Sequence, residues 1–126
     1  MIIGLDSADP RIVLGSHAGC MPGIGALARS GAAGAIRSTF PPITVPAWVT
    51  MTTGLCPGSL GLYGFHERIP GSYGRRLSTS SSVRAPRIWD LAGRHGLRSI
   101  VLGVPLTWPP PGEFEGALVT DCPDPC

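Results

Sequence analysis

The stretch PRIWDLAGRHGLRSIVLGV, residues 86–104, joins a helix pattern to a strand pattern and decides the fold class. Pro86 is placed to open a helix, apolar residues recur at helical spacing behind it, and Gly96 marks its end. Residues 99–104 are nearly all apolar, which is typical of a buried strand. A helix that leads directly into a buried strand is one step of an α/β fold.

Outward from this step, strand and helix patterns continue to alternate. They predict a strand at residues 2–5 ending in Asp6, a helix from Pro22 to Gly31, a strand at 35–40, a helix whose first residue is Pro46, and a last short strand at 117–119. This order indicates a parallel, helix-flanked α/β sheet, in which ligands gather at the carboxyl ends of the strands. We therefore expect Asp6, and Thr44 just before its helix, at that edge.

Residues 58–82 interrupt this alternation. The segment is rich in Gly, Ser and Arg, and its apolar residues have no clear period. We predict a long excursion across the surface, with the serine tract 78–82 as solvated loop. A chain of 126 residues suffices for one compact domain and is too short for two, so residues 1–126 are expected to form one unit.

The composition excludes several classes of function. All ten basic residues are Arg, and the formal net charge is only +2. Scattered arginines with so small a net charge do not predict a nucleic-acid surface. The absence of Lys rules out a P-loop, whose lysine contacts phosphates. No apolar stretch approaches the ~18 residues of a membrane span, and no signal-peptide pattern occurs, so we expect a cytoplasmic protein without a nucleic-acid or membrane partner.

The four cysteines are expected to remain free thiols, because disulfide frameworks belong to oxidising compartments. They are Cys20, Cys56, Cys122 and Cys126. The last two belong to the sequence CPDPC, which lacks the second pair of ligands that a structural zinc site needs. Solvated thiols are therefore the preferred interpretation.

Residues 23–28, GIGALA, match the G-x-G-x-x-A form of a dinucleotide-binding turn. Arg37, at the end of the next predicted strand, would then meet the 2′-phosphate of NADP. Two observations argue against this turn. Residues 15–22 separate it from the nearest apolar run, and no acidic residue lies between Asp9 and Glu67 to bind a ribose. An NADP-binding module stays an alternative interpretation.

The segment FPPITVPAW, residues 40–48, carries the candidate nucleophile. Prolines on both sides hold the Thr44 hydroxyl at the start of a helix, where backbone N–H groups and the helix dipole favour an anion such as a phosphoryl group. A threonine hydroxyl needs a base or a metal ion to attack phosphorus, and Asp6 is a candidate ligand for that ion. In isolation, such a Thr is more commonly a helix cap and such an Asp a turn former.

Taken in order, several segments resemble the N-terminal portion of the alkaline phosphatase superfamily, in its type I phosphodiesterase and nucleotide pyrophosphatase branch. They are IIGLDSADP at residues 2–10, MPGIGALARSGA at 21–32, PPITVPAWVTMTTGLCPGSLGLYGF at 41–65, RIWDLAGRHG at 87–96 and SIVLGVPLTWPPPGEFEGALVT at 99–120. The resemblance implies a hydrolase of phosphate esters with an alkaline-phosphatase-type parallel sheet. It also implies two divalent metal ions, expected to be zinc, with Asp6 as a metal ligand and Thr44 as the metal-bound nucleophile that forms a phosphothreonine.

The chain departs from the family pattern at three of these positions. Ser7 stands where the family has Gly, a change that is tolerable if the turn needs no positive φ. Leu60 replaces a customary His. Phe65 occupies the position of an Asn that contacts phosphate in nucleotide pyrophosphatases, so that phosphate contact is not predicted here.

The family's later Asp-x-x-x-His, Asp-His and His motifs do not occur in this sequence. His95 follows Asp90 at the wrong spacing, and His17 and His66 lie in predicted loops, so all three histidines are interpreted as solvated. We therefore expect a truncated N-terminal portion with half a binuclear site and little or no turnover. The alternative is a non-catalytic interaction fragment that pairs with another chain, or with itself, to complete the sheet. The substrate, the choice between diester and monoester, and the identity of the metal stay open.

Overall fold

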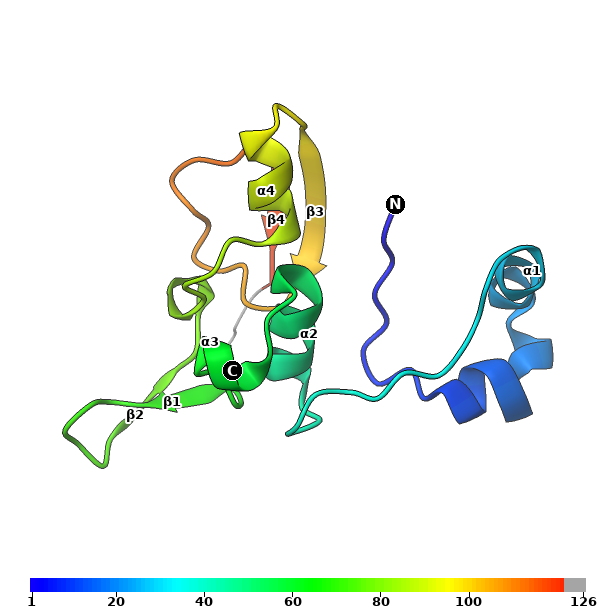
Figure 1. The fold of residues 1–126 in the computed structure, drawn as a ribbon, viewed down its shortest axis with the longest axis horizontal. Helices are drawn as coiled ribbons and strands as arrows, with labels where there is room; N and C mark the ends of the chain where they lie inside the picture. Colours follow the sequence, from blue (N-terminus) through cyan, green and yellow to red (C-terminus); the bar gives the residue numbers. More distant parts are fainter. Residues whose placement is uncertain (122–126) are drawn as a thin grey trace. The chain divides into compact units, whose positions relative to one another are not determined.

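The computed structural model describes residues 1–121 and divides into two compact units, Met1–Arg37 and Ser38–Cys126 (Figure 1). The assignment of residues 1–126 to one hydrolase domain stays a prediction. Cys122 and Cys126, and the metal alternative for CPDPC, lie outside the described residues. The two cysteines that are described, Cys20 and Cys56, are exposed free thiols, as predicted.

The first unit consists of short helices. Two irregular helical segments, Ile12–Ser16 and Ala18–Cys20, lead into helix α1 (Pro22–Ser30). The predicted start at Pro22 and stop at Gly31 are confirmed, because Pro22 is the first helical residue and Gly31 is the cap residue. None of the side chains of this unit is buried, so the unit has no core of its own.

The strands predicted at residues 2–5 and 35–40 are wrong. Both segments are irregular, and their large apolar side chains are exposed: Ile2 73%, Ile3 68%, Leu5 59%, Ile36 93% and Phe40 91%. A strand exists only where its backbone N–H and C=O groups bond to a neighbouring strand. The two sheets that residues 1–121 form have two strands each, and neither sheet includes these segments.

The core of the second unit is centred on helix α2 (Thr44–Thr53). Val45 and Val49 lie one turn apart on the same helix face and are 2% and 0% exposed. They pack together with Leu62 and Leu106. Because the face of α2 that carries these valines is fixed against the core, the direction of the helix start is fixed as well.

The α-to-β step that the sequence predicts is present. Helix α4 (Ile88–Arg94) is followed by strand β3 (Ser99–Val104), which pairs in parallel with strand β4 (Gly116–Thr120) (Figure 1). The α/β character is thus confirmed at the level of mixed helices and small sheets. A larger sheet of the alkaline phosphatase type is not formed by residues 1–121, since their parallel sheet has two strands.

Helix α4 begins at Ile88, not at Pro86 as the sequence predicts. Arg87 is its cap residue, and the Asp90 carboxylate accepts the backbone N–H of Arg87 at 2.7 Å. A carboxylate in the first turn that reaches back to the cap is one half of a capping box. This hydrogen bond, and not the proline, determines where the helix starts. The predicted helix end is confirmed, because His95 is the cap residue there.

The predicted surface excursion contains regular structure that the sequence pattern missed. Its elements are helix α3 (Pro57–Leu60), an antiparallel hairpin of β1 (His66–Arg68) and β2 (Arg75–Leu77), and a short 3₁₀ helix (Ser80–Ser82). The serine tract is also not a solvated loop throughout. Ser78 is 2% exposed, and its hydroxyl donates to the carbonyl of Gly64 at 3.0 Å. Hydrogen bonds such as this one, and not an apolar periodicity, order this part of the segment.

Gly116 provides a test of the β3–β4 pair. Its φ is 138°, and a Cβ placed there would lie 1.8 Å from the backbone oxygen of Ser99, its partner in the register. We expect Gly116→Ala to force the strands apart and to lower the free energy of unfolding by at least about 3 kcal/mol. Urea unfolding measures the loss. Gly112→Ala is the matched control, because its Cβ would meet nothing within 4 Å; equal stability of the two variants would contradict the register.

Candidate active site

Thr44, the predicted nucleophile, is the first residue of helix α2. It is half-buried, so its hydroxyl is not enclosed by the apolar core. Ile43 before it is extended, with φ −120° and ψ 151°, and no side chain of this cap residue bonds the helix start. The first turn contains no acidic residue. The positive end of the helix dipole therefore has no carboxylate in its own first turn, which favours an external anion there.

The helix begins two residues earlier than the sequence predicts. Pro46 is its third residue and is fully buried. Because the first N–H groups of a helix have no partner within it, proline is tolerated throughout the first turn and does not mark its first residue uniquely. The approach to Thr44 is fixed by hydrogen bonds: the Ile43 N–H and the Thr39 hydroxyl donate to the carbonyl of Pro41 at 3.0 and 2.9 Å.

Asp6, the predicted metal ligand, is exposed and lies in a turn. Its carboxylate accepts the backbone N–H of Ser7 at 3.1 Å, which is the contact of a turn former. Ser7 has a φ of 57°. Serine was expected to replace the family's glycine without cost only if the turn needs no positive φ, and this condition is not met. The left-handed backbone of Ser7 lowers the stability of the fold by about 1 kcal/mol.

Asp6 belongs to the first unit and Thr44 to the second. A cation bound by both Asp6 and Thr44 therefore stays a prediction. Among residues 1–121, no three His, Cys, Asp or Glu side chains lie close enough together to hold a metal ion. The described residues thus provide candidate single ligands, and they do not provide a complete metal centre.

The three histidines are exposed, as predicted. His66, however, lies on strand β1 and not in a loop. His17 also has a partner that the sequence did not suggest, because its Nδ1 lies 2.8 Å from the hydroxyl of Ser16. His95 is the cap residue of α4.

The backbone does not form the turn that the NADP alternative requires. Residues 23–28 lie inside helix α1, which follows a 3₁₀ segment. A dinucleotide-binding turn joins a strand directly to a helix, and the first strand within residues 1–121 is β1. Arg37 correspondingly follows an irregular segment. The GIGALA residues lie within helix α1, and their glycines do not form a phosphate-binding turn.

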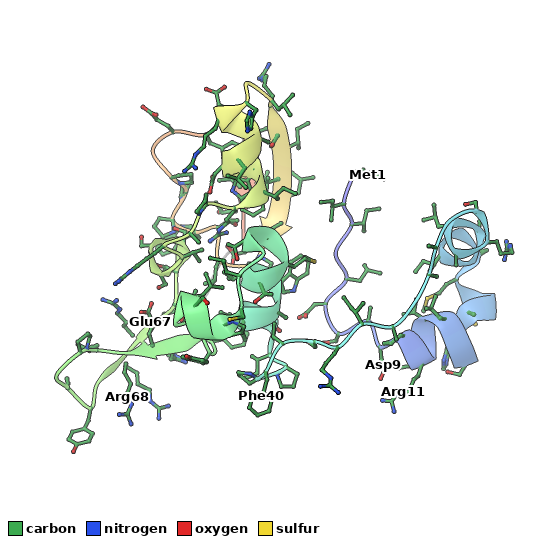
Figure 2. The ribbon with its side chains drawn as sticks, in the orientation of Figure 1. Met1, Asp9, Arg11, Phe40, Glu67 and Arg68 are labelled. Atoms are coloured by element: carbon green, nitrogen blue, oxygen red, sulfur yellow. The ribbon has the colours of Figure 1, made fainter. Side chains whose placement is uncertain are left out.

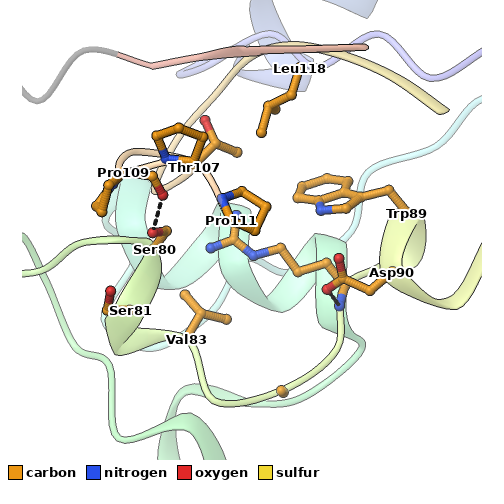
Figure 3. Close-up of a pocket in the computed structure, with 12 residues that line it drawn as sticks. Ser80, Ser81, Val83, Trp89, Asp90, Thr107, Pro109, Pro111 and Leu118 are labelled. Carbon is orange, nitrogen blue, oxygen red and sulfur yellow. Dashed lines mark hydrogen bonds between the residues drawn. The ribbon is translucent and has the colours of Figure 1, made fainter. Parts of the chain in front are cut away.

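A cavity of about 290 Å³ lies in the second unit, between the start of α4 and the loop that follows β3 (Figure 3). Arg87 lines it and is 6% exposed. Its guanidinium donates to the carbonyl of Leu106 and lies 5.3 Å from the ring centroid of Trp89. Burial is the largest influence and lowers the pKa of Arg87 from its ordinary value, whereas the charges of Asp90 and Asp121 raise it.

Asp121 holds the loop that follows β3. Its carboxylate accepts the backbone N–H groups of Leu106 at 2.8 Å, Thr107 at 2.8 Å and Trp108 at 3.1 Å. The Thr107 hydroxyl in turn accepts the N–H of Asp121 at 2.9 Å. Leu106 has a φ of 61°, which is unfavourable for leucine, and it is 5% exposed. The carboxylate therefore stabilises a strained loop at the carboxyl ends of both parallel strands.

Comparison with known sequences gives one result that covers almost the whole chain. Residues 1–123 match the family described as type I phosphodiesterase / nucleotide pyrophosphatase. The chain belongs to this family. The resemblance predicted from the sequence is thereby confirmed. No curated protein and no solved structure matches the chain.

Type I phosphodiesterases / nucleotide pyrophosphatases are hydrolases of phosphate esters, and the family is in general metal-dependent. The donors expected here are the carboxylate of Asp6 and the hydroxyl of Thr44. A zinc ion commonly takes four ligands, and two ions need more. Residues 1–121 therefore do not fit a complete two-metal site. None of the helices in this part of the chain has the length and hydropathy needed to cross a bilayer.

For this phosphodiesterase-family chain, sequence reasoning overlooked Arg87 and Asp121. Asp121 lies two residues beyond the strand predicted at 117–119, and a carboxylate after an apolar run is also the pattern that singled out Asp6, so the signal was present. Arg87 had no such signal. Its burial depends on the fold of the loop after β3, which the sequence pattern described only as a proline-dense connector.

Asp121→Asn tests the support of this loop. The substitution places an amide nitrogen or a neutral oxygen where two carboxylate oxygens now accept backbone N–H groups. We expect a loss of about 2 to 3 kcal/mol in the free energy of unfolding, because hydrogen bonds to a charged acceptor are lost and a buried N–H stays unsatisfied. Chemical denaturation provides the measurement. Glu113→Gln removes the same charge at an exposed position and should change stability little; an equal loss in both variants would refute a specific role of Asp121.

Glu67 makes stability depend on pH. The hydroxyl of Ser82 and, next, the guanidinium of Arg76 lower the pKa of Glu67 from 4.5. The folded state therefore holds the proton less tightly than the unfolded state, so this stabilisation is present above pH 4.5 and is lost as the pH falls through the folded pKa. Glu67→Gln should flatten the acid limb of the unfolding free energy, measured by urea titrations at several pH values. A limb as steep as in the wild type would contradict this linkage.

Proposed function

We propose that this chain carries the nucleophile of a metal-dependent phosphoric-ester hydrolase, with Thr44 as the attacking group and Asp6 as a metal ligand. The observation that supports the proposal is that Thr44 is the first residue of helix α2, in a chain that belongs to a family of phosphate-ester hydrolases. Thr44 begins helix α2, while Val45 and Pro46 beside it are buried in the core. The hydroxyl is thus attached to a helix start that packing holds in place.

In this proposal, the helix start binds the phosphoryl group and the hydroxyl reacts with it. The N–H groups of the first turn and the helix dipole favour the anionic phosphoryl oxygens. The Thr44 oxygen forms a bond to phosphorus as it loses its proton to solvent water, and the bond from phosphorus to the leaving oxygen breaks in line as that oxygen takes up a proton from water. Water then hydrolyses the phosphothreonine and restores the hydroxyl.

Two divalent ions, zinc by expectation, would supply Lewis-acid stabilisation of the attacking and leaving oxygens when bound. Asp6 and the Thr44 oxygen are the ligands that we propose for this chain. Because residues 1–121 include no cluster of three potential ligands, the remaining ligands would have to come from elsewhere. We therefore expect little turnover from the chain by itself.

Comparison of Thr44 variants tests this function. The assay uses bis-p-nitrophenyl phosphate with zinc, and mass spectrometry searches for phosphate on the peptide that contains Thr44. Because the turnover of the chain by itself is expected to be small, the rates are compared after subtraction of the uncatalysed background; we expect Thr44→Ala to abolish this remaining rate and the phosphopeptide, and Thr44→Ser to retain part of both. Thr53→Ala, at the opposite end of α2, is the matched control and should behave like the wild type. Equal rates for the wild type and Thr44→Ala would remove Thr44 from the chemistry.

A second candidate function has one observation in its favour. The parallel β3–β4 pair exposes Ile100, Leu102 and Val119 to 77%, 66% and 59%. Parallel sheets are normally covered on both faces. An interaction fragment that pairs with another chain, or with a second copy, would cover these side chains. Light scattering after size-exclusion chromatography distinguishes the possibilities, since a stable monomer argues against such pairing.

A further inference from the structure

The β1–β2 hairpin places two arginines side by side. Arg68 and Arg75 are directly opposite each other in the antiparallel register. The next pair along, Ile69 and Gly74, is hydrogen-bonded, with the Ile69 N–H donating to the Gly74 carbonyl at 3.0 Å. Bonded and non-bonded pairs alternate in an antiparallel ladder, so Arg68 and Arg75 form a non-bonded pair, in which side chains approach most closely. Like charges in this position destabilise a hairpin.

The only acidic residue of the hairpin lies on its other face. Glu67 and Arg68 project to opposite sides of the strand (Figure 2), and the Glu67 carboxylate pairs with Arg76 at 3.3 Å. Of the carboxylates that the structure describes, none pairs with Arg68 or Arg75. Both arginines are exposed. Their repulsion is therefore not relieved within the described part of the chain.

The positive charge of the chain is concentrated around this hairpin. Residues 66–84 contain four arginines and one glutamate, a net charge of +3, whereas the complete chain carries +2. No acidic residue occurs between Glu67 and Asp90. Arg68 and Arg75 are separated in the sequence, and the register of the hairpin places them opposite each other. Such a local field attracts anionic surfaces.

The tip of the hairpin is uncharged and partly apolar. Residues 69–74 connect the two strands, and Tyr73 and Ile69 are 97% and 40% exposed. The arginine pair stands immediately behind this tip. Tyrosine suits the boundary between water and lipid, because its ring is apolar and its hydroxyl polar. Single strands of nucleic acid, by contrast, are bound in positively charged grooves, and the apolar tip would contribute little to such a groove.

We propose that the β1–β2 hairpin is a docking surface for an anionic lipid membrane. Arg68 and Arg75 contact the phosphate and carboxylate groups of the lipids, and Tyr73 with Ile69 enters the interface between headgroups and acyl chains. Anionic lipid headgroups balance the positive charges of these two arginines, with which no described carboxylate of the protein pairs. Binding is reversible and peripheral, and it does not depend on the catalytic role of Thr44.

Vesicle flotation with the complete chain tests this surface. The vesicles contain phosphatidylcholine either alone or with about a third of phosphatidylserine. We expect binding to the anionic vesicles only. The double variant Arg68→Gln, Arg75→Gln should bind about 30-fold more weakly, because each arginine near an anionic surface contributes about fivefold. Tyr73→Ser should weaken binding without changing its dependence on phosphatidylserine.

A charge-matched control separates this site from a general effect of net charge. Arg94→Gln, Arg98→Gln removes two exposed arginines outside the hairpin and should retain most of the binding. Thermal unfolding should show the hairpin variant at least as stable as the wild type, since its like-charge pair is gone. Equal losses in both double variants, no binding of the wild type, or equal binding to neutral vesicles would each overturn the proposal. A single-stranded oligonucleotide that binds the same two arginines more tightly than the vesicles do would also overturn it.

Discussion

The packing of Val45 and Val49 against Leu62 and Leu106 is the contact on which the second unit depends. These are four of the five buried valine and leucine side chains among the described residues, so the unit has a small core and little redundancy. The contact fixes α2 from its first turn onward. The location of the Thr44 hydroxyl at the helix start is therefore a consequence of core packing, together with the hydrogen bonds of the loop that precedes the helix.

Leu106 connects this core to the edge where β3 and β4 end. Its side chain is part of the core, its N–H bonds to the carboxylate of Asp121, and its carbonyl accepts a hydrogen bond from Arg87. Leu106 makes these three contacts at an unfavourable φ, and together they offset its cost. One residue thus links the core, the end of the sheet and the charged wall of the cavity, so a change at Asp121 is expected to affect all of them.

Local patterns predicted the elements whose causes are local. The start of α1 at Pro22 and the strand at 99–104 were predictable, because proline geometry and a continuous apolar run act within a few residues. A strand also needs a neighbour, which a local pattern does not supply: residues 99–104 pair with β4, whereas residues 2–5 and 35–40 belong to neither sheet of the described chain. Of the candidate site, the sequence located Thr44 at a helix start to within two residues. It could not show that the register of the hairpin places Arg68 directly opposite Arg75.

The two interpretations of the chain share one physical requirement. A parallel pair with Ile100 and Leu102 exposed is not a stable endpoint for an α/β sheet, because parallel sheets bury both faces. A hydrolase needs a larger sheet to align the carboxyl ends of several strands around a metal centre, and an interaction fragment needs a partner to cover the same face. Additional strands would extend the sheet for a hydrolase, and helices or a partner chain packed on the sheet would cover the exposed face in either case. Catalysis alone would further require that Asp6 and Thr44 bind the same cation, and this requirement separates the two interpretations.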